Sequence, residues 1–138
     1  MNKGALCVMC FLASCAMAAP SARAADVRIS NSHLLAVCFA GKPVSADQRR
    51  WNVTEPVSLT FTMRNQPRPG IANHDPGIAV IDFAPEAGHQ YEIEVRGDAA
   101  AFSARVWTRG QWRPVVRDRT TDQIVSSDPK WIEVGCGK

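Results

Sequence analysis

The chain of 138 residues carries 16 Lys or Arg and 13 Asp or Glu, a formal net charge of +3 with neutral histidines. This excess is far smaller than that of a typical nucleic-acid-binding domain, so the composition argues against nucleic acid as a partner. The length is that of one domain of ordinary size preceded by a short leader.

Residues 1–24 have the three parts of a secretory signal peptide. Lys3 gives the positive start, residues 4–19 form an uncharged apolar run, and Pro20 ends any helix there because it lacks an N–H. A membrane-spanning helix is disfavoured because the run is shorter than the roughly 20 residues needed to cross a bilayer. We therefore expect export, with the periplasm of a bacterium as the destination.

Two processing sites compete within this leader. Ala22-Arg23-Ala24 is an A-x-A site, which predicts cleavage before Ala25 and a single mature domain over residues 25–138. Leu12-Ala13-Ser14-Cys15 resembles the lipobox of bacterial lipoproteins. Lipidation of Cys15 would tether the product to the membrane, facing the periplasm. The Ala-rich run before Ala25 is typical of ordinary cleavage and favours the soluble product.

The mature domain keeps two of the five cysteines, Cys38 near its start and Cys136 near its end. In an oxidising compartment, two cysteines in a small domain most simply form one disulfide. A metal site or a redox pair is disfavoured because neither cysteine has C-x-x-C spacing or a histidine near it in sequence. We therefore expect a structural disulfide, with no metal and no cofactor.

The mature sequence alternates apolar and polar residues, as is typical of β-strands. The expected strands are Val27–Ser30, Leu34–Phe39, Val57–Met63, Ile78–Phe83, Tyr91–Arg96, Phe102–Trp107, Gln111–Arg117, Gln123–Ser126 and Trp131–Cys136. Residues 45–50 would form at most one short turn of helix. The pattern predicts an all-β fold, an antiparallel β-sandwich of about 7–9 short strands, with a small β-barrel as the alternative.

The longest expected loop lies at residues 65–77 and is rich in Pro, Gly and Asn. Function often resides in such loops. Within it, His74 and Asp75 are either a contact for a metal or partner, or part of an Asp-Pro-Gly turn in which Asp75 caps its own backbone. Two potential ligands are too few for a metal site, so we favour the turn.

A hairpin around Gly110 is the sequence feature most informative about function. If residues 108–110 form the turn, with Gly110 in the left-handed conformation, the flanking strands place six apolar residues on one face. The opposite face then carries Arg105, Trp107, Arg113 and Arg117, with Arg105 directly across from Arg113. Trp and Arg are enriched in binding hot spots, and guanidinium groups bind carboxylates and phosphates. This face is therefore a candidate docking surface for another envelope protein or an anionic envelope component.

A purely structural alternative exists for the same residues. In it, the arginines form salt bridges with Glu92, Glu94, Asp98 or Asp118, and Trp107 packs beneath their stems. Charges on a strand that contains Pro114 also protect a sheet edge from pairing with another chain.

Two segments resemble a known group of proteins. Residues 82–93 (DFAPEAGHQYEI) end a strand in an aromatic residue and open the next with a Gly-x-x-Tyr turn, and residues 116–125 (VRDRTTDQIV) hold a later turn. This combination resembles a pattern in small bacterial envelope proteins and lipoproteins, in which the later turn reads Asp-x-x-Thr-Gly. Asp122 stands here in place of that Gly. The resemblance covers under half of the mature chain. It implies a β-sandwich in the envelope, without common catalytic residues.

Catalytic motifs are absent from the sequence. His33, His74 and His89 stand alone in their segments, and neither a Gly-x-Ser-x-Gly elbow nor a His-Glu-x-x-His zinc motif occurs. An enzyme would need His74 or His89 to meet acidic residues in a pocket. We therefore expect a non-enzymatic binding or structural module of the bacterial cell envelope that docks an acidic partner. The alternative is a periplasmic inhibitor or immunity protein directed against an exported hydrolase.

Overall fold

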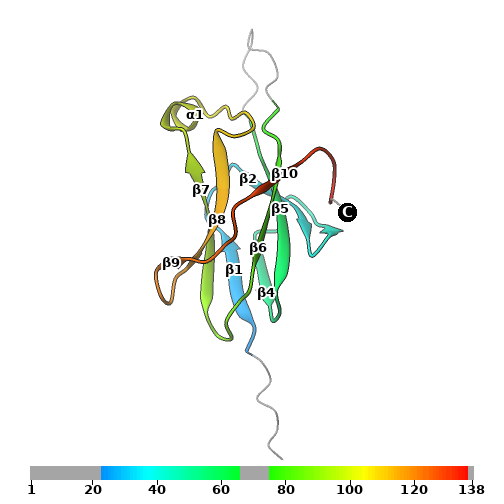
Figure 1. Ribbon diagram of the computed structural model, residues 1–138, viewed down its shortest axis with the longest axis vertical. Coiled ribbons are helices and arrows are strands. Elements are labelled where there is room, and N and C mark those ends of the chain that lie inside the picture. Colours follow the sequence, from blue (N-terminus) through cyan, green and yellow to red (C-terminus); the bar gives the residue numbers. More distant parts are fainter. Residues whose placement is uncertain (1–22, 66–74, 137–138) are drawn as a thin grey trace, which may run out of the picture.

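The computed structural model describes residues 23–65 and 75–136, which form two β-sheets of five strands each (Figure 1). The strands are β1 (Ala25–Ile29), β2 (Leu34–Phe39), β3 (Lys42–Pro43), β4 (Arg50–Val53), β5 (Val57–Met63), β6 (Ile78–Phe83), β7 (Gln90–Gly97), β8 (Trp112–Asp118), β9 (Gln123–Ile124) and β10 (Lys130–Ile132). A short helix, α1 (Ala99–Ala104), follows β7. The expected all-β sandwich is confirmed.

The strand order is β4-β1-β7-β8-β9 in the first sheet, sheet A, and β10-β6-β5-β2-β3 in the second, sheet B. Neighbouring strands are antiparallel except β1 and β7, which pair in parallel. The start of β1 lies at the end of the sandwich opposite α1 (Figure 1). Residues 45–50 form no helix, and the unexpected strand β4 begins at Arg50 and pairs with β1.

The core lies between the two sheets and is built from the apolar half of each alternating strand. Tyr91 and Ile93 of β7 are buried on one side, and Leu59 and Phe61 of β5 on the other. The ring of Phe83 meets that of Tyr91 edge-on, with the centroids 5.2 Å apart. Each such side chain contributes about 1.5–3 kcal/mol relative to an exposed one, so the alternation itself determines which faces meet.

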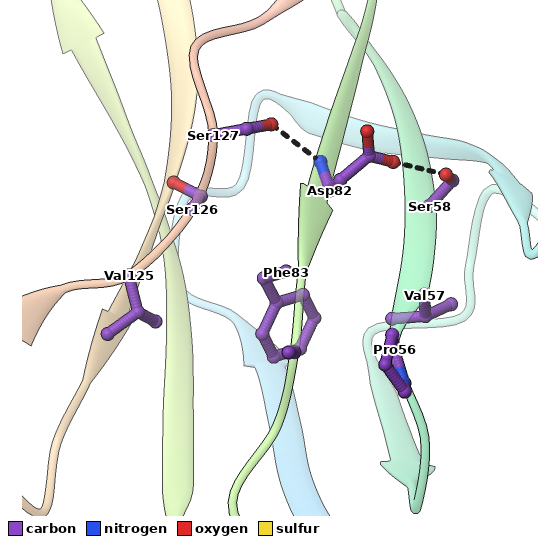
Figure 2. A pocket seen from close by; sticks show the side chains of 9 residues that line it. Pro56, Val57, Ser58, Asp82, Phe83, Val125, Ser126 and Ser127 are labelled. Atoms are coloured by element: carbon purple, nitrogen blue, oxygen red, sulfur yellow. Dashed lines mark hydrogen bonds between the residues drawn. The ribbon is translucent and has the colours of Figure 1, made fainter.

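After β9 the chain crosses from sheet A to sheet B through residues 125–129. Ser127 makes two hydrogen bonds to β6 at this crossing, and Figure 2 draws the one to its hydroxyl. Its backbone N–H donates to the Asp82 carbonyl and its hydroxyl accepts from the Asp82 N–H, each over 2.9 Å. The crossing therefore continues the edge of sheet B before β10 begins.

A change of register in β2 positions Cys38. Ala36 pairs with Phe61, but Cys38 pairs with Thr60, so the ladder shifts by one residue at Val37. Because successive side chains in a strand point to opposite faces, this bulge turns Cys38 to the outer face of sheet B. A regular strand would have directed it into the core beside Ala36.

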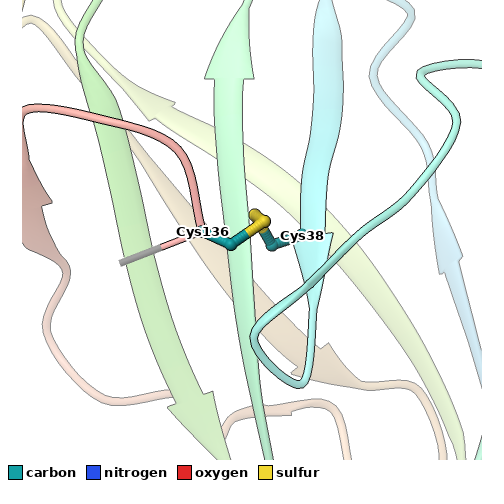
Figure 3. Close-up of a disulfide and its surroundings, with 2 residues drawn as sticks. All are labelled: Cys38 and Cys136. Atoms are coloured by element: carbon teal, nitrogen blue, oxygen red, sulfur yellow. A yellow bond between two sulfur atoms is a disulfide. The ribbon is translucent and has the colours of Figure 1, made fainter. Parts of the chain in front are cut away.

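Cys136 reaches Cys38 across that outer face, and the expected disulfide is confirmed (Figure 3). The two Cα atoms are 5.4 Å apart, and the cysteines are separated by 98 positions in sequence. The expected strand Trp131–Cys136 ends early, because only residues 130–132 pair with β6. We call residues 133–136 the C-terminal strap, since the disulfide fixes them over sheet B.

The expected strand Phe102–Trp107 is wrong, because this segment begins as helix α1. Asp98 caps the helix: its carboxylate accepts hydrogen bonds from the backbone N–H of Ala100 and Ala101, at 2.8 and 3.3 Å. Three alanines then follow, and Ala has the highest helix propensity. The helix ends at Arg105, which adopts a left-handed φ of 55°. An N-cap followed by good helix formers thus overrode the alternation of Phe102, Ala104 and Val106.

Several turns expected from the sequence are present. Gly88 has a φ of +75° in the turn before β7, and the carboxylate of Asp75 accepts the N–H of Gly77 over 2.9 Å. The favoured Asp75 turn is therefore confirmed, whereas His74 lies outside the described residues. Asp122, which stands where the resemblance expects Gly, has a φ of 60°. Asp is one of the few residues that tolerate this conformation, so the turn forms without Gly.

The leader is mostly outside the described residues. The apolar run, Pro20 and the lipobox cysteine Cys15 all precede residue 23, where the description begins. In the part of the chain that is described, no helix is long and apolar enough to span a membrane.

Candidate functional site

The four residues predicted to share a docking face do not do so. The predicted hairpin is wrong because β8 pairs with β7. The register begins with Gly97 opposite Trp112 and ends with Tyr91 opposite Asp118. Arg113 and Arg117 lie on the outer face of β8, but Arg105 ends α1 and Trp107 is only 1% exposed. The turn that was expected at residues 108–110 does form, with the N–H of Gln111 donating to the Thr108 carbonyl.

Trp107 is a core residue held by Asn65. The Trp107 N–H donates to Asn65 Oδ1 over 2.7 Å, and Asn65 Nδ2 donates to the Trp107 carbonyl over 3.0 Å. Its ring meets Phe102 edge-on at 5.6 Å and His33 at 5.2 Å between centroids. Trp107 therefore closes the core beneath α1. The hairpin predicted an exposed Trp107, and this prediction is wrong.

Arg96 of β7, rather than Arg105, lies opposite Arg113. Both side chains are exposed on the outer face of sheet A. Arg96 has only a distant carboxylate, with its Nη2 4.0 Å from Glu94 Oε2. The guanidinium of Arg113 has no hydrogen bond or ion pair within the described part of the chain. Like charges directly across a strand pair are destabilising, so this arrangement has a cost to folding.

A hollow of about 710 Å³ opens beside this pair, and we call it the arginine groove. It is lined by Arg96, Gly97, Gly110, Trp112, Arg113, Asp128, Pro129 and Trp131. Its charged lining residues are thus two arginines and one aspartate, and Asp128 forms no ion pair with either of them. The groove has the size of a small-molecule site and a net positive lining.

Two tryptophans and one further arginine shape the wall of the groove. The ring of Trp131 meets Trp112 edge-on at 5.1 Å, and Trp112 Nε1 donates to the Pro76 carbonyl over 2.7 Å. The guanidinium of Arg109 lies 5.8 Å from the Trp131 ring centre and is 2.9 Å from Glu133 of the C-terminal strap. The aromatic wall is therefore fixed from several sides rather than free to move with a ligand.

Gly97 allows β7 and β8 to meet closely at the groove. A Cβ atom there would lie 2.1 Å from the Gln111 carbonyl oxygen, far inside van der Waals contact. Asp98 next to it donates its N–H to the same carbonyl over 2.8 Å. Only glycine permits this approach, which sets the register that places Arg96 opposite Arg113.

Pro114 marks the free edge of sheet A along the groove. The backbone groups of Val116 point away from β7, since its carbonyl accepts the Val125 N–H and its N–H donates to the Ser126 hydroxyl. Pro114 lies two residues earlier in the strand, so its backbone points the same way. Within the described residues, β9 pairs only with Arg117 and Asp118, so no strand pairs with Pro114 on this side, and Pro114 itself is buried. The missing N–H costs no ladder bond there and weakens the edge as a template for an added strand.

Arg117 is an engaged arginine, in contrast to Arg113. Its Nε lies 2.9 Å from Glu94 Oε1, and its Nη1 lies 3.3 Å from Asp122 Oδ1. The hydrogen bond that Arg117 donates to Glu94 raises the pKa of its guanidinium above the usual value. The structural alternative that pairs the arginines with acidic residues thus holds for Arg117.

His89 meets two carboxylates at the opposite end of sheet A. Its Nδ1 is 2.7 Å from Asp118 Oδ2, and its Nε2 is 3.2 Å from Glu86 Oε2. Asp118 is buried and also accepts the backbone N–H of Thr120 and Thr121. We call His89, Glu86 and Asp118 the histidine clasp.

The charges of the clasp support one another. The hydrogen bond to Asp118 is the largest influence on His89 and raises the pKa of its imidazole. Burial acts most strongly on Asp118 and opposes ionisation, but the bonds from His89, Thr120 and Thr121 together outweigh it and lower the pKa of Asp118. With a carboxylate beside each ring nitrogen, neither nitrogen of His89 is free to accept a proton from a nucleophile. The clasp joins the turn before β7 to the turn after β8.

The sequence contained a signal for the position of Arg96 in the candidate site, which the apolar–polar alternation of residues 102–107 obscured. Asp98 and the three alanines after it predict a helix start, which ends the preceding strand at Gly97. That boundary would have made Arg96 the last outward side chain of β7. No comparable signal predicted that Trp131 would lie beside it, because the two are brought together only by the packing of sheet A on sheet B.

The comparisons with known proteins give no further assignment. In the described ranges, no group of three or more His, Cys, Asp or Glu side chains is placed to hold a metal ion. No protein-family model matches the chain, and neither a curated protein nor a solved structure is found to match it.

Proposed function

We propose that this protein is an exported, non-enzymatic binding module of the bacterial cell envelope that docks an acidic protein segment in the arginine groove. The observation that carries the proposal is the pair Arg96 and Arg113, opposite each other without a close carboxylate beside Arg113. An arrangement that destabilises the free protein, at a surface hollow, is best explained by a ligand that supplies the missing negative charge.

The groove favours carboxylate side chains over a membrane surface. Guanidinium groups bind carboxylates in bidentate geometry, and Trp131 offers an aromatic wall beside them. The three large apolar side chains that are most exposed in the described residues are Ile124, Val125 and Val134, and none of them lines the groove. A headgroup-binding surface would be expected to present such side chains for insertion into the lipid.

Pro114 favours docking through side chains rather than strand addition. Pro114 is buried and has no N–H to donate on the unpaired side of β8, so an added strand would lack a ladder bond there. An acidic segment held by its carboxylates needs no such bond.

Export is supported by the leader and by the compartment that the disulfide implies. Disulfides persist in oxidising compartments, of which the bacterial periplasm is one. We propose cleavage before Ala25 and a soluble product. The inhibitor alternative relied on the long loop, of which residues 66–74 lie outside the description, and no contact of the described residues favours it.

The binding proposal is tested by fluorescence anisotropy with a labelled oligo-glutamate peptide. The variant Arg96→Gln/Arg113→Gln should weaken binding roughly tenfold or more, since a hydrogen bond between charged groups contributes about 1.5–3 kcal/mol. Affinity of the unaltered protein should also fall as salt is added.

The matched control is Arg28→Gln/Arg64→Gln, which removes the same two charges from exposed positions outside the groove. Its affinity should stay close to that of the unaltered protein. Equal losses in both double variants would reduce the effect to net charge and overturn the groove as the site. Vesicles of phosphatidylglycerol serve as a second probe, and tighter binding to them than to the peptide contradicts the choice of a protein partner.

Export is tested by intact mass spectrometry of the protein released from the periplasm. We expect the mass of residues 25–138 with one disulfide. A full-length chain in the cytoplasm contradicts export, and a lipid on Cys15 contradicts the soluble product.

A further inference from the structure

A second hollow lies where the chain crosses from sheet A to sheet B. It has a volume of about 600 Å³ and is lined by Pro56, Val57, Ser58, Asp82, Phe83, Ala84, Val125, Ser126 and Ser127 (Figure 2). We call it the serine hollow. Pro56, Val57, Ser58 and Asp82 also line a neighbouring hollow of about 560 Å³ that continues toward Cys136 and the C-terminal strap.

The polar side of the serine hollow has unused hydrogen-bonding capacity. The hydroxyls of Ser126 and Ser127 each accept a backbone N–H, from Val116 and Asp82. Each keeps its own O–H to donate, because no acceptor contacts it within the described residues. Ser58 donates to one carboxylate oxygen of Asp82, which leaves the other oxygen, Oδ2, as an acceptor (Figure 2).

The other side of the hollow is apolar. Phe83 and Val57 come from the inner faces of neighbouring strands and are buried in the core, and Val125, which is exposed, lies across from them (Figure 2). Val125 is 37% exposed and Ile124 beside it is 42% exposed, which makes them two of the most exposed large apolar residues in the described ranges. A ligand here would cover apolar surface and satisfy hydroxyls and a carboxylate together.

The charges around the hollow exclude an anion and do not require a cation. Asp82 is the charged residue that lines it, and Lys130 lines the hollow that adjoins it. The serine hollow itself thus has one carboxylate, Asp82, one oxygen of which already accepts from Ser58, whereas the lining of the arginine groove is positive. Donors, an acceptor and an apolar wall match a ligand that itself carries hydroxyls, an amide and apolar carbon, and such a ligand need not be charged.

We propose that the serine hollow binds a neutral N-acetylhexosamine unit of a glycan chain. The amide N–H of the acetamido group would donate to Asp82 Oδ2, the sugar hydroxyls would accept from Ser126 and Ser127, and the acetyl methyl would pack on Val125. This site is separate from the arginine groove, and its test does not depend on an acidic partner.

The test is an NMR titration of the whole mature protein, labelled with ¹⁵N, with the β-1,4-linked tetramer of N-acetylglucosamine. We expect saturable shifts of the Asp82, Ser126 and Ser127 amide signals. The variant Asp82→Asn should weaken binding roughly tenfold, because it replaces a charge-assisted hydrogen bond with a neutral one. Asp82 is exposed, and the amide oxygen of Asn can still accept from Ser58, so the fold should be kept.

Two controls sharpen the outcome. Asp47→Asn removes an exposed carboxylate that lines a different hollow and should leave binding unchanged. Cellotetraose has the same linkage without acetamido groups and should bind more weakly. Absent shifts at Asp82, Ser126 and Ser127, equal affinity of the Asp82→Asn variant, or equal binding of cellotetraose would each overturn the proposal.

Discussion

The two outer faces of this sandwich differ far more than the two inner ones. On sheet A the outward side chains of β7 and β8 are charged at nearly every register position, from Glu92 opposite Arg117 to Arg96 opposite Arg113. On sheet B the outward residues of β5 are Ser58, Thr60 and Thr62, and Thr60 is only 2% exposed. The outer face of sheet A carries mostly charged side chains. The outer face of sheet B is partly covered, and its outward residues on β5 are uncharged.

The cause of the difference is the path of the chain end. The bulge at Val37 turns Cys38 outward, and the disulfide to Cys136 fixes the C-terminal strap over sheet B. No corresponding segment of the described chain covers β7 and β8. A sheet face that no other segment covers is in contact with water and therefore carries charged side chains. Where these side chains lack partners, they are available to a ligand.

Removal of the disulfide is expected to have the largest effect on the difference between the two outer faces, because it releases the C-terminal strap from sheet B. In the chain-entropy model, closing a loop of about 100 residues contributes up to about 4.7 kcal/mol, and the cysteines here are 98 positions apart. Urea denaturation of a Cys38→Ala/Cys136→Ala variant should therefore show a loss of several kcal/mol. Reduced unaltered protein should resemble the variant. An unchanged free energy of unfolding would show that the strap contributes nothing to folding.

Gly97→Ala should have the next largest effect, on sheet A. The new Cβ would meet the Gln111 carbonyl at 2.1 Å, and overpacking of this kind costs about 1–3 kcal/mol. The comparison is Gly110→Ala, where no atom lies within 4 Å of the new Cβ and only the backbone conformation, at a φ of 88°, is penalised. Thermal denaturation distinguishes the two. A smaller loss at Gly97 than at Gly110 would contradict the close approach of β7 and β8.

A smaller effect of opposite sign is expected at Arg113. Arg113→Gln removes a like charge opposite Arg96 and should stabilise the protein by about 0.2–1 kcal/mol, while it weakens binding of the acidic peptide. Arg117→Gln should instead destabilise, because Arg117 is paired with Glu94 and Asp122. Urea denaturation of both variants at low salt measures the contrast, which should shrink at high salt. Destabilisation by both substitutions would mean that Arg113 has a partner after all.

The histidine clasp should give the smallest effect, visible as a pH dependence. The raised pKa of His89 makes its contribution fully present below the ordinary histidine pKa of about 6.5 and lost as the pH rises through the folded value. The lowered pKa of Asp118 makes its contribution present above about 3.9 and lost as the pH falls. The clasp thus stabilises most between these two values.

The measurement compares the melting temperature of the unaltered protein with that of His89→Gln across this range. The difference between them should be largest in mildly acidic buffer and should decline toward alkaline pH. A difference that grows above neutral pH would reverse the sign derived from the contacts of His89.

Much of the fold could be predicted because local alternation and burial agree. The strands Leu34–Phe39, Val57–Met63 and Ile78–Phe83 begin and end where the pattern places them, and the only two cysteines of the expected mature domain form the disulfide. The pattern failed at residues 102–107. There the apolar positions suit a helix as well as a strand, and the cap at Asp98 decides between them.

The candidate site was less predictable, because it depends on which strands are neighbours. Arg113 was expected in a binding face, but its partner across the ladder was taken from the nearest segment in sequence. The actual partner, Arg96, lies before the helix, and Trp131 comes from the other sheet. Pairings between distant segments are fixed by packing of the whole domain, which alternation within one segment does not report.

The most direct test of the account is an NMR map of where the oligo-glutamate peptide binds. We predict shifts of the Arg96, Gly97 and Arg113 amide signals and of the Trp131 indole, with Asp82 and Ser58 unchanged. Shifts confined to the outer face of sheet B, or the absence of shifts at the arginine groove when the peptide is bound, would contradict the assignment of the arginine groove on sheet A as the docking surface.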